Sequence, residues 1–125
     1  MSMSNPGSYE RIQGMLGLPF VAYMAHPYGG DFGNIVKART MASKISEKYP
    51  DLVIVNPLDN FQFMRDVDEV NVLQACSTLL AKCDILILTG DWHESVGCRA
   101  ELEVARNFGL ARIEMDSSME IKAVD

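Results

Sequence analysis

A run of five residues, His26, Pro27, Tyr28, Gly29 and Gly30, combines side chains and backbone suited to ligand binding. Adjacent glycines let the backbone approach a bound molecule closely, and a helix that begins after such a loop can receive an anion. The glycine spacing and the lysine of dinucleotide-binding and Walker loops are missing. A histidine here could bind a ligand or move a proton, although a packing role is more common. The run alone is compatible with a plain tight turn.

A second segment, GDWHESVGCRAELEVA, has the pattern of a loop followed by a helix. At the start of that helix, Ser95 and Gly97 would present a hydroxyl and free N–H groups, which can bind a phosphate or sugar oxygen. Cys98 lies near the same end, but no paired histidine indicates a nucleophile, so we expect it to pack. From spacing alone Glu101 is a surface carboxylate. Its neighbours, which include Asp91, favour a place in a site.

No metal or cofactor is expected. His26, His93, Asp91 and Glu94 lack the spacing of a defined metal site, such as two histidines four residues apart on a helix. Trp92 belongs to the same loop and could stack on a flat ligand or lie exposed at an oligomer contact.

Bulk composition narrows the class of protein. The chain has 125 residues, 48% of them hydrophobic, which fits one folded domain with a real core. The net charge of −6 disfavours a nucleic-acid polymer as partner. No apolar run reaches 18 residues, so no membrane span is expected. Three cysteines, an odd number, indicate reduced thiols and a cytoplasmic protein. Residues 1–17 lack the pattern of a secretory signal and are expected to form a loose tail before a domain over 18–125.

Strands and helices alternate along the chain, which predicts an α/β fold. We expect a single-domain, three-layer sandwich with a parallel sheet of four to five strands, of the Rossmann or flavodoxin-like type. Ligands of such folds bind beyond the carboxyl ends of the strands. The expected strands are Pro19–Ala25, Leu52–Val55, Asp84–Thr89, Leu110–Met115 and, with a weaker pattern, Glu120–Val124.

Three helices should position the site. Asn34 is expected to cap the first, whose apolar residues from Ile35 to Ile45 repeat at helical spacing. The second is expected over Val67–Lys82 and the third over Val96–Phe108. Gly109 is expected to close the third helix. One face of the second helix should contain Val70, Leu73, Cys76, Ser77 and Leu80.

Both segments resemble signatures of the nucleoside 2-deoxyribosyltransferase superfamily, which includes 2′-deoxynucleoside 5′-phosphate N-hydrolases. More narrowly, they resemble a bacterial and phage branch with AHPYGG and GDW..S.GC..E motifs. The first signature is a tyrosine, two small or apolar residues and Gly-Pro-aromatic. Tyr23 to Tyr28 follow it, with His26 in place of glycine, which narrows the pocket. The second signature is matched by Gly97, Glu101, Leu102 and Ala105. The similarity spans roughly residues 20–115.

The resemblance implies cleavage, by hydrolysis or base exchange, of the N-glycosidic bond of a nucleoside or nucleoside 5′-phosphate. Glu101 would attack C1′ as the base leaves, and a glycosyl-enzyme ester would form. Tyr23 would orient Glu101. Ser95, six residues before that glutamate, would hold a 5′-phosphate, as in the nucleotide-hydrolysing members. Water or a second base would then take the sugar.

The sequence departs from the family at the residue that assists the leaving base. Many members place an aspartate eight residues before the aspartate that opens the central strand. Counting back from Asp84 reaches Cys76, a poor general acid at neutral pH. Asp91 or Asp59 could replace it from nearby loops. Alternatively, the protein binds a nucleotide-derived small molecule without cleaving it.

The candidate catalytic residues are therefore Glu101, Tyr23 and Asp91. The ligand is expected to be a nucleoside or nucleotide, with no nucleic-acid polymer or membrane as partner. The resemblance also implies a homo-oligomer in which the Asp116–Ser118 segment reaches a neighbour's site, and a scaffold with a vestigial pocket is a third alternative. The candidate ligand-binding residues are His26, Pro27, Tyr28, Gly29, Gly30, Asp59, Ser95, Gly97, Cys98 and Ser117.

Overall fold

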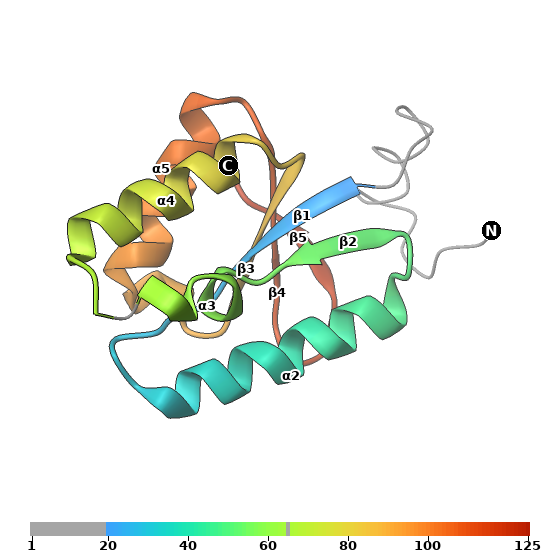
Figure 1. Ribbon diagram of the computed structural model, residues 1–125. Helices are drawn as coiled ribbons and strands as arrows, with labels where there is room; N and C mark the ends of the chain where they lie inside the picture. The colour runs from blue at the N-terminus through green and yellow to red at the C-terminus, as the bar shows by residue number, and fades with distance from the viewer. Residues whose placement is uncertain (1–19, 65) are drawn as a thin grey trace.

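The computed structural model describes residues 20–64 and 66–125 (Figure 1). The tail expected over residues 1–17 lies outside them, as do the first two residues of the expected domain. No helix within the described ranges is long and apolar enough to cross a membrane. The elements follow in the order β1 (Phe20–Ala25), α2 (Phe32–Lys48), β2 (Leu52–Val55), α3 (Pro57–Asn60), η1 (Gln62–Met64), α4 (Glu69–Ala81), β3 (Ile85–Thr89), η2 (Trp92–Glu94), α5 (Val96–Asn107), β4 (Ala111–Met115) and β5 (Ile121–Ala123).

In the described part of the chain, five strands form one sheet in the order β2-β1-β3-β4-β5. The first four strands are parallel, and β5 pairs antiparallel with β4 from Ile113↔Ala123 to Met115↔Ile121. The expected α/β fold is thus confirmed, with one correction: the fifth strand is an antiparallel edge. A parallel neighbour needs a long crossover, whereas the short Asp116–Glu120 connection permits only a reversal.

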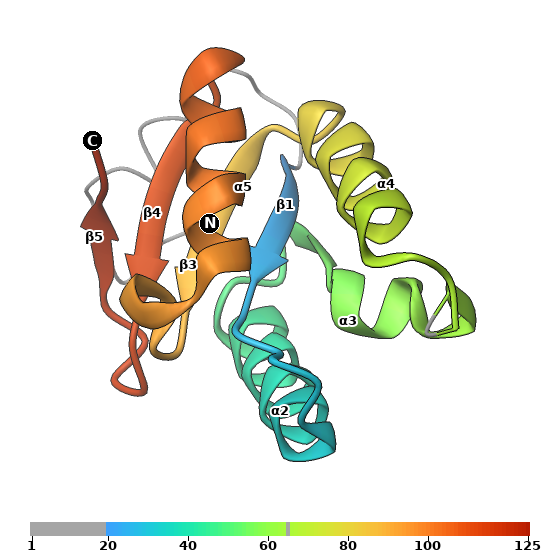
Figure 2. The ribbon, with the colours of Figure 1, turned by 90° about the vertical axis from the view of Figure 1, so that its left-hand side faces the viewer.

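Helices cover both faces of the sheet (Figures 1 and 2). The helix α2 lies on one face, while α4 and α5 lie side by side on the other. Along β1 and β3 the side chains alternate between these two layers because successive residues of a strand point to opposite faces. Met24 and Ile87 join the core under α2, and Tyr23 and Leu88 join the core under α4 and α5.

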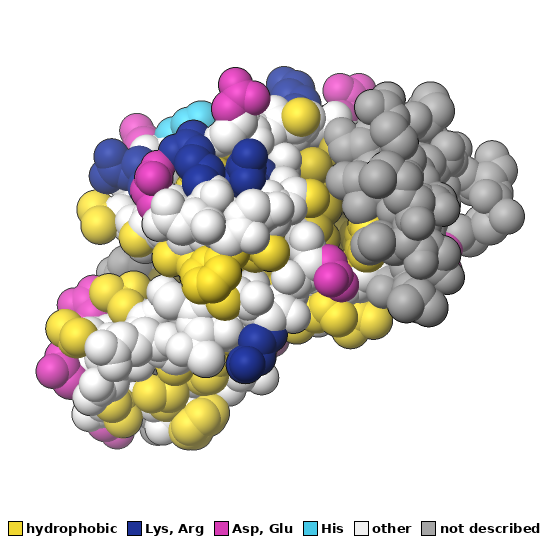
Figure 3. Space-filling model, turned by 90° about the horizontal axis from the view of Figure 1, so that it is seen from above, with side chains coloured by type: hydrophobic (Ala, Val, Ile, Leu, Met, Phe, Trp, Pro, Cys, Tyr) yellow, Lys and Arg dark blue, Asp and Glu magenta, His cyan; other side chains and the backbone are white. Residues whose placement is uncertain are grey.

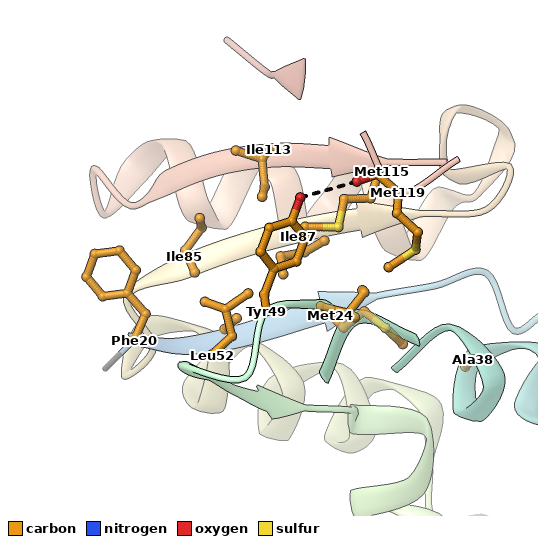
Figure 4. Packing of buried hydrophobic residues seen from close by; sticks show 12 residues of the cluster. Phe20, Met24, Ala38, Tyr49, Leu52, Ile85, Ile87, Ile113, Met115 and Met119 are labelled. Atoms are coloured by element: carbon orange, nitrogen blue, oxygen red, sulfur yellow. Dashed lines mark hydrogen bonds between the residues drawn. The ribbon is translucent and has the colours of Figure 1, made fainter. Parts of the chain in front are cut away.

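The core under α2 includes Tyr49, the residue that caps the C-terminal end of this helix. Figure 4 shows Tyr49 reaching across the strands, where its hydroxyl donates a hydrogen bond to the Met119 carbonyl at 3.4 Å. Phe20, Leu52 and Ile113 pack in the same cluster. Leu58 of α3 packs against the same cluster and also lines the cleft described below.

The expected cap of the first helix is wrong. The helix α2 begins at Phe32, and its N-cap is Asp31, whose side chain accepts a hydrogen bond from the Gly33 N–H at 2.8 Å. Asn34 lies inside the first turn of α2, because the helix is capped at Asp31, three residues before the expected cap. On α4, Val70 and Leu73 are 58% and 44% exposed. The helix packs through its later half, where Leu80 is buried, and its first half stands clear of the sheet.

The chain reverses its direction of winding between β1 and β3. From β1 it crosses to β2 at one edge, and from β3 it crosses to β4 on the other side. A crevice opens at such a switch point, beyond the carboxyl ends of the strands. The buried hydroxyl of Thr89 donates to the Ala25 carbonyl at 2.7 Å and ties the two strand ends that flank this crevice.

Candidate active site

A cleft of about 850 Å³ occupies the switch point. It brings together the loop after β1, the segment from η2 into α5, and a wall formed by α3, η1 and α4. The two sequence segments singled out for chemistry therefore face one space. Of the predicted ligand-binding residues, the cleft is lined by His26, Pro27, Tyr28, Gly29, Gly30, Ser95, Gly97 and Cys98.

Glu101 lies in the second turn of α5 and lines the cleft, with Tyr23 behind it. The hydroxyl of Tyr23 donates a hydrogen bond to Oε2 of Glu101. Tyr23 itself is fully buried under α4 and α5 and does not line the cleft. It can therefore orient Glu101, and it has no surface left for a ligand.

The expectation from spacing that Glu101 is a surface carboxylate is wrong. The side chain is partly buried, because α4 lies beside α5 and covers this side of the helix. Burial raises the pKa of Glu101 to about 7, and the hydrogen bond from Tyr23 opposes that rise. The pKa of Tyr23 is held well above its usual range by burial and by the nearby Glu101 charge, so the tyrosine remains a donor. A carboxylate that loses its proton near pH 7 can serve as nucleophile or as proton acceptor.

Cys76 projects from α4 into the same cluster. Its thiol lies near enough to Tyr23 and Glu101 for each to influence its pKa. Burial raises the pKa of this thiol. At neutral pH Cys76 is thus a neutral group beside the Tyr23–Glu101 pair, and it does not supply the acidic proton that an aspartate would supply there.

The helix α5 begins at the edge of the cleft. Ser95 is its N-cap, and its Oγ accepts a hydrogen bond from the Cys98 N–H at 3.2 Å. The N–H groups of Val96 and Gly97 belong to the first turn, which helix geometry leaves without an intrahelical acceptor. Cys98 is 1% exposed and the pKa of its thiol is raised by burial to about 12, in line with the expected packing role.

The loop after β1 is held against the loop after β3. His26 is half-buried, and its Nδ1 donates to the Pro27 carbonyl at 2.9 Å in the tautomer that this contact requires. Burial lowers the pKa of His26, and the Asp91 charge only partly offsets that effect. Gly90 has a φ of +64°, and a Cβ there would lie 2.9 Å from Nε2 of His26. The imidazole therefore packs directly on the Gly90 backbone.

The other predicted acids divide into one that faces the cleft and one that does not. Asp91 lines the cleft, but Asp59 is absent from its lining and forms an ion pair with Arg39 at 2.6 Å. Ser117 also lies away from the cleft within this chain, in the turn after β4. Asp91 and Glu101 thus line the same cleft, whereas Asp59 and Ser117 lie outside it.

Trp92 is 8% exposed, which contradicts the expectation of an exposed loop aromatic. Its ring stacks on His93, and its indole N–H donates to Glu114 at 3.0 Å. These contacts fix η2 against β4 and leave no face of the ring for a ligand in the cleft. Within residues 20–64 and 66–125, no three His, Cys, Asp or Glu side chains are grouped so that they could hold a metal ion.

The apolar wall opposite the α5 terminus was missed by the sequence analysis. Pro57, Leu58, Phe61, Met64, Val72 and Leu73 line it. The segment NPLDNFQFM, to which the sequence patterns assign no helix, forms α3 and η1. The signal that could have found this helix is Pro57, since proline favours the first position of a helix. The wall gives the cleft a flat apolar side suited to a planar ring.

Comparisons with known proteins agree with this architecture. A family model described as Domain of unknown function (DUF4406) matches residues 21–114. The fold is similar to a solved structure titled 2-desoxiribosyltransferase from Leishmania mexicana, with a TM-score of 0.58 and 18% identity. The match covers 83% of this chain and 79% of that chain. No curated protein matches the sequence. The resemblance to the nucleoside 2-deoxyribosyltransferase superfamily is thus confirmed in the fold.

Proposed function

Because the chain belongs to the family described as Domain of unknown function (DUF4406) and has the fold of a 2-desoxiribosyltransferase, we propose that it is an N-glycosidase or deoxyribosyltransferase. Its substrate is a nucleoside or a nucleoside 5′-phosphate. The observation that carries this proposal is the Tyr23–Glu101 hydrogen bond at the cleft. A buried tyrosine that holds a carboxylate in place at a ligand-sized cleft suits a nucleophile.

The reaction follows from the position of Glu101. A carboxylate oxygen attacks C1′ of the sugar, the C1′–N bond breaks, and its electron pair leaves with the base. Water, or a second base, then attacks C1′ of the resulting ester and releases Glu101. Tyr23 fixes the carboxylate rotamer, which limits the entropy lost in reaching the attack geometry. Asp91, which faces the same cleft, is the candidate for protonating a neutral leaving base.

The test is release of free base from a panel of purine and pyrimidine nucleosides, as ribosides and 2′-deoxyribosides, with and without a 5′-phosphate. Glu101→Gln should lower the rate at least about 1000-fold, since it removes the nucleophile. The matched control is Glu103→Gln on the same helix, where the exposed carboxylate pairs with Arg106. Failure to release base from any compound at high enzyme concentration, or equal loss in both variants, would contradict the proposal.

A second candidate function is binding of a nucleotide-derived small molecule without turnover. The observation that favours it is the neutral Cys76 thiol beside Tyr23 and Glu101. Calorimetry with the same panel would then show saturable binding, and chromatography would recover the ligand intact. A ligand recovered as separate base and sugar would rule out this alternative.

A further inference from the structure

The charged side chains that line the cleft are all acidic in the described part of the chain: Glu69, Asp91, Glu94 and Glu101. We propose that the site acts on N-glycosides whose base carries a formal positive charge, such as N-alkylated purine and pyridinium nucleosides, in preference to neutral nucleosides and nucleoside phosphates. This inference rests on the proposed function and names its substrate class.

Among residues 20–64 and 66–125, Lys and Arg side chains are found near the cleft but not in its lining. Lys37, on α2, lowers the pKa of His26 through its charge. It is not one of the residues that line the cleft. Arg99 points its Nε toward the Ser95 carbonyl, at 3.4 Å, and is exposed to solvent. Since His26 has a lowered pKa, it is neutral at pH 7. No lysine or arginine within residues 20–64 and 66–125 lines the cleft to offset its four carboxylates, so the field inside it favours a cation.

Chemistry at the leaving group points to the same substrates. A neutral base must gain a proton as the C1′–N bond breaks, and the neutral Cys76 thiol, with its raised pKa, is unsuited to give one. For a neutral base that step therefore depends on Asp91. A base that is already cationic takes the electron pair of the broken bond and departs as a neutral molecule, with no proton transfer. Glu101 alone then suffices to form the ester, and water completes the cycle.

The anion site at the start of α5 is weak for a phosphate. The Ser95 Oγ accepts the Cys98 N–H, so the donors left for a phosphate are its own O–H and the backbone N–H groups of the first turn. Glu94 immediately precedes it and lines the cleft. A phosphate dianion at Val96 and Gly97 would meet this carboxylate and that of Glu101, and the helix terminus offers only about half a positive charge against them.

The shape of the cleft accommodates the charged ring. The wall formed by Phe61, Met64, Val72 and Leu73 is apolar, and Glu69 stands beside it at the start of α4. Seen from above, the lower part of the left-hand end of the molecule shows exposed acidic side chains next to hydrophobic ones, and Lys or Arg side chains lie in its upper part (Figure 3). A planar cation fits this combination because one surface packs against its face while carboxylates balance its charge.

The experiment compares kcat/KM for 7-methylguanosine, guanosine and guanosine 5′-phosphate, each also as its 2′-deoxy form, and for nicotinamide riboside. Rates without enzyme are subtracted because methylated bases leave spontaneously. We expect the cationic compounds to exceed guanosine at least about tenfold. Glu69→Gln and Glu94→Gln should each lower the ratio of 7-methylguanosine to guanosine about two- to fivefold, as one removed charge should do near water. Added salt should lower the same ratio.

The matched control is Glu47→Gln, an exposed carboxylate on α2 that does not line the cleft, which should leave the ratio unchanged. Dissociation constants measured with the Glu101→Gln variant separate recognition of the charged base from the weaker glycosidic bond of the methylated nucleoside. In this variant 7-methylguanosine should bind at least about fivefold tighter than guanosine. Faster turnover of guanosine or its phosphate would overturn the inference and leave the proposed function standing. A preference that neither Glu69→Gln nor Glu94→Gln changes would also overturn it. If the enzyme cleaves none of these compounds and none of the nucleoside panel, both this inference and the proposed function are contradicted.

Discussion

Oε2 of Glu101 accepts a hydrogen bond from the hydroxyl of Tyr23, 78 positions earlier in the chain. Tyr23 comes from the buried centre of the sheet, and Glu101 comes from the second turn of α5. The contact forms only when β1 and the β3–α5 unit are packed together. It therefore links the stability of the fold to the orientation of the one carboxylate that we propose as nucleophile.

Activity should rise with pH through about 7. Glu101 must be ionised to attack, and its pKa is raised by burial to about 7. Below pH 6, kcat/KM should fall about tenfold per pH unit, and above pH 8 it should level off. Since the Tyr23 hydrogen bond lowers this pKa, Tyr23→Phe should move the inflection upward. The profile is measured with a substrate that does not titrate between pH 5 and 9, and a flat profile over that range would contradict the assignment.

Glu101→Gln should stabilise the protein at high pH. At pH 4 the carboxyl is protonated in both the folded and the unfolded chain, so the substitution changes little. As the pH rises through about 7 the folded carboxyl binds a proton more tightly than the unfolded one, and ionised Glu101 then costs stability. Above pH 8 the variant should gain on the order of 2 to 3 kcal/mol in free energy of unfolding. Urea titrations at pH 4 and pH 8 measure this, with Glu103→Gln expected to show no such gain.

Gly90→Ala should destabilise the fold and disturb the cleft. The positive φ of Gly90 strains any other residue, and the added Cβ would lie 2.9 Å from the His26 ring. We expect a loss of about 2 to 3 kcal/mol. Gly109→Ala is the control, since its φ is +66° but its Cβ would meet nothing within 4 Å, so it should lose only about 1 kcal/mol. In the His26→Ala background, the Gly90→Ala loss should shrink toward the Gly109 value, with a remainder from Pro27 Cδ at 3.2 Å. An undiminished loss would disprove the His26 contact.

Ser95→Ala should loosen the start of α5. The substitution removes the acceptor of the Cys98 N–H and should cost about 1 kcal/mol of stability. Ser95→Asp keeps an acceptor and adds a favourable charge at the helix N-terminus, so it should retain the wild-type stability. Thermal unfolding of both variants measures the effect. Equal destabilisation would show that the serine matters for a reason other than capping.

Much of the fold could be predicted because it depends on local patterns. Uninterrupted apolar runs such as Ile85–Thr89 are typical of central parallel strands, and the alternation of strands and helices leaves few topologies open. The direction of β5 could have been predicted and was missed, because the connection between the expected strands Leu110–Met115 and Glu120–Val124 is too short for a parallel crossover. The N-cap of α2 was misplaced by three residues, since both Asp31 and Asn34 are good caps and only the loop geometry chooses between them.

The candidate site could be located but not described in full. The two segments at His26 and Ser95 were expected at one site because both follow the carboxyl ends of predicted strands, and they do line one cleft. The burial of Glu101 could not be predicted, because the residues that cover it come from α4, far away in the sequence. The exposure of Val70 and Leu73 could not be predicted for the same reason: helical spacing indicates an apolar face but not whether anything packs against it.

The most direct test of the nucleophile is the covalent intermediate itself. A 2′-fluoro-substituted nucleoside with a good leaving base slows hydrolysis of the ester, so the sugar should remain attached to the enzyme. Intact-mass spectrometry should show the addition of one sugar, and peptide mapping should place it on Glu101. The adduct should be absent from Glu101→Gln and present in Glu103→Gln. Base release with no adduct, or an adduct on another residue, would contradict the account.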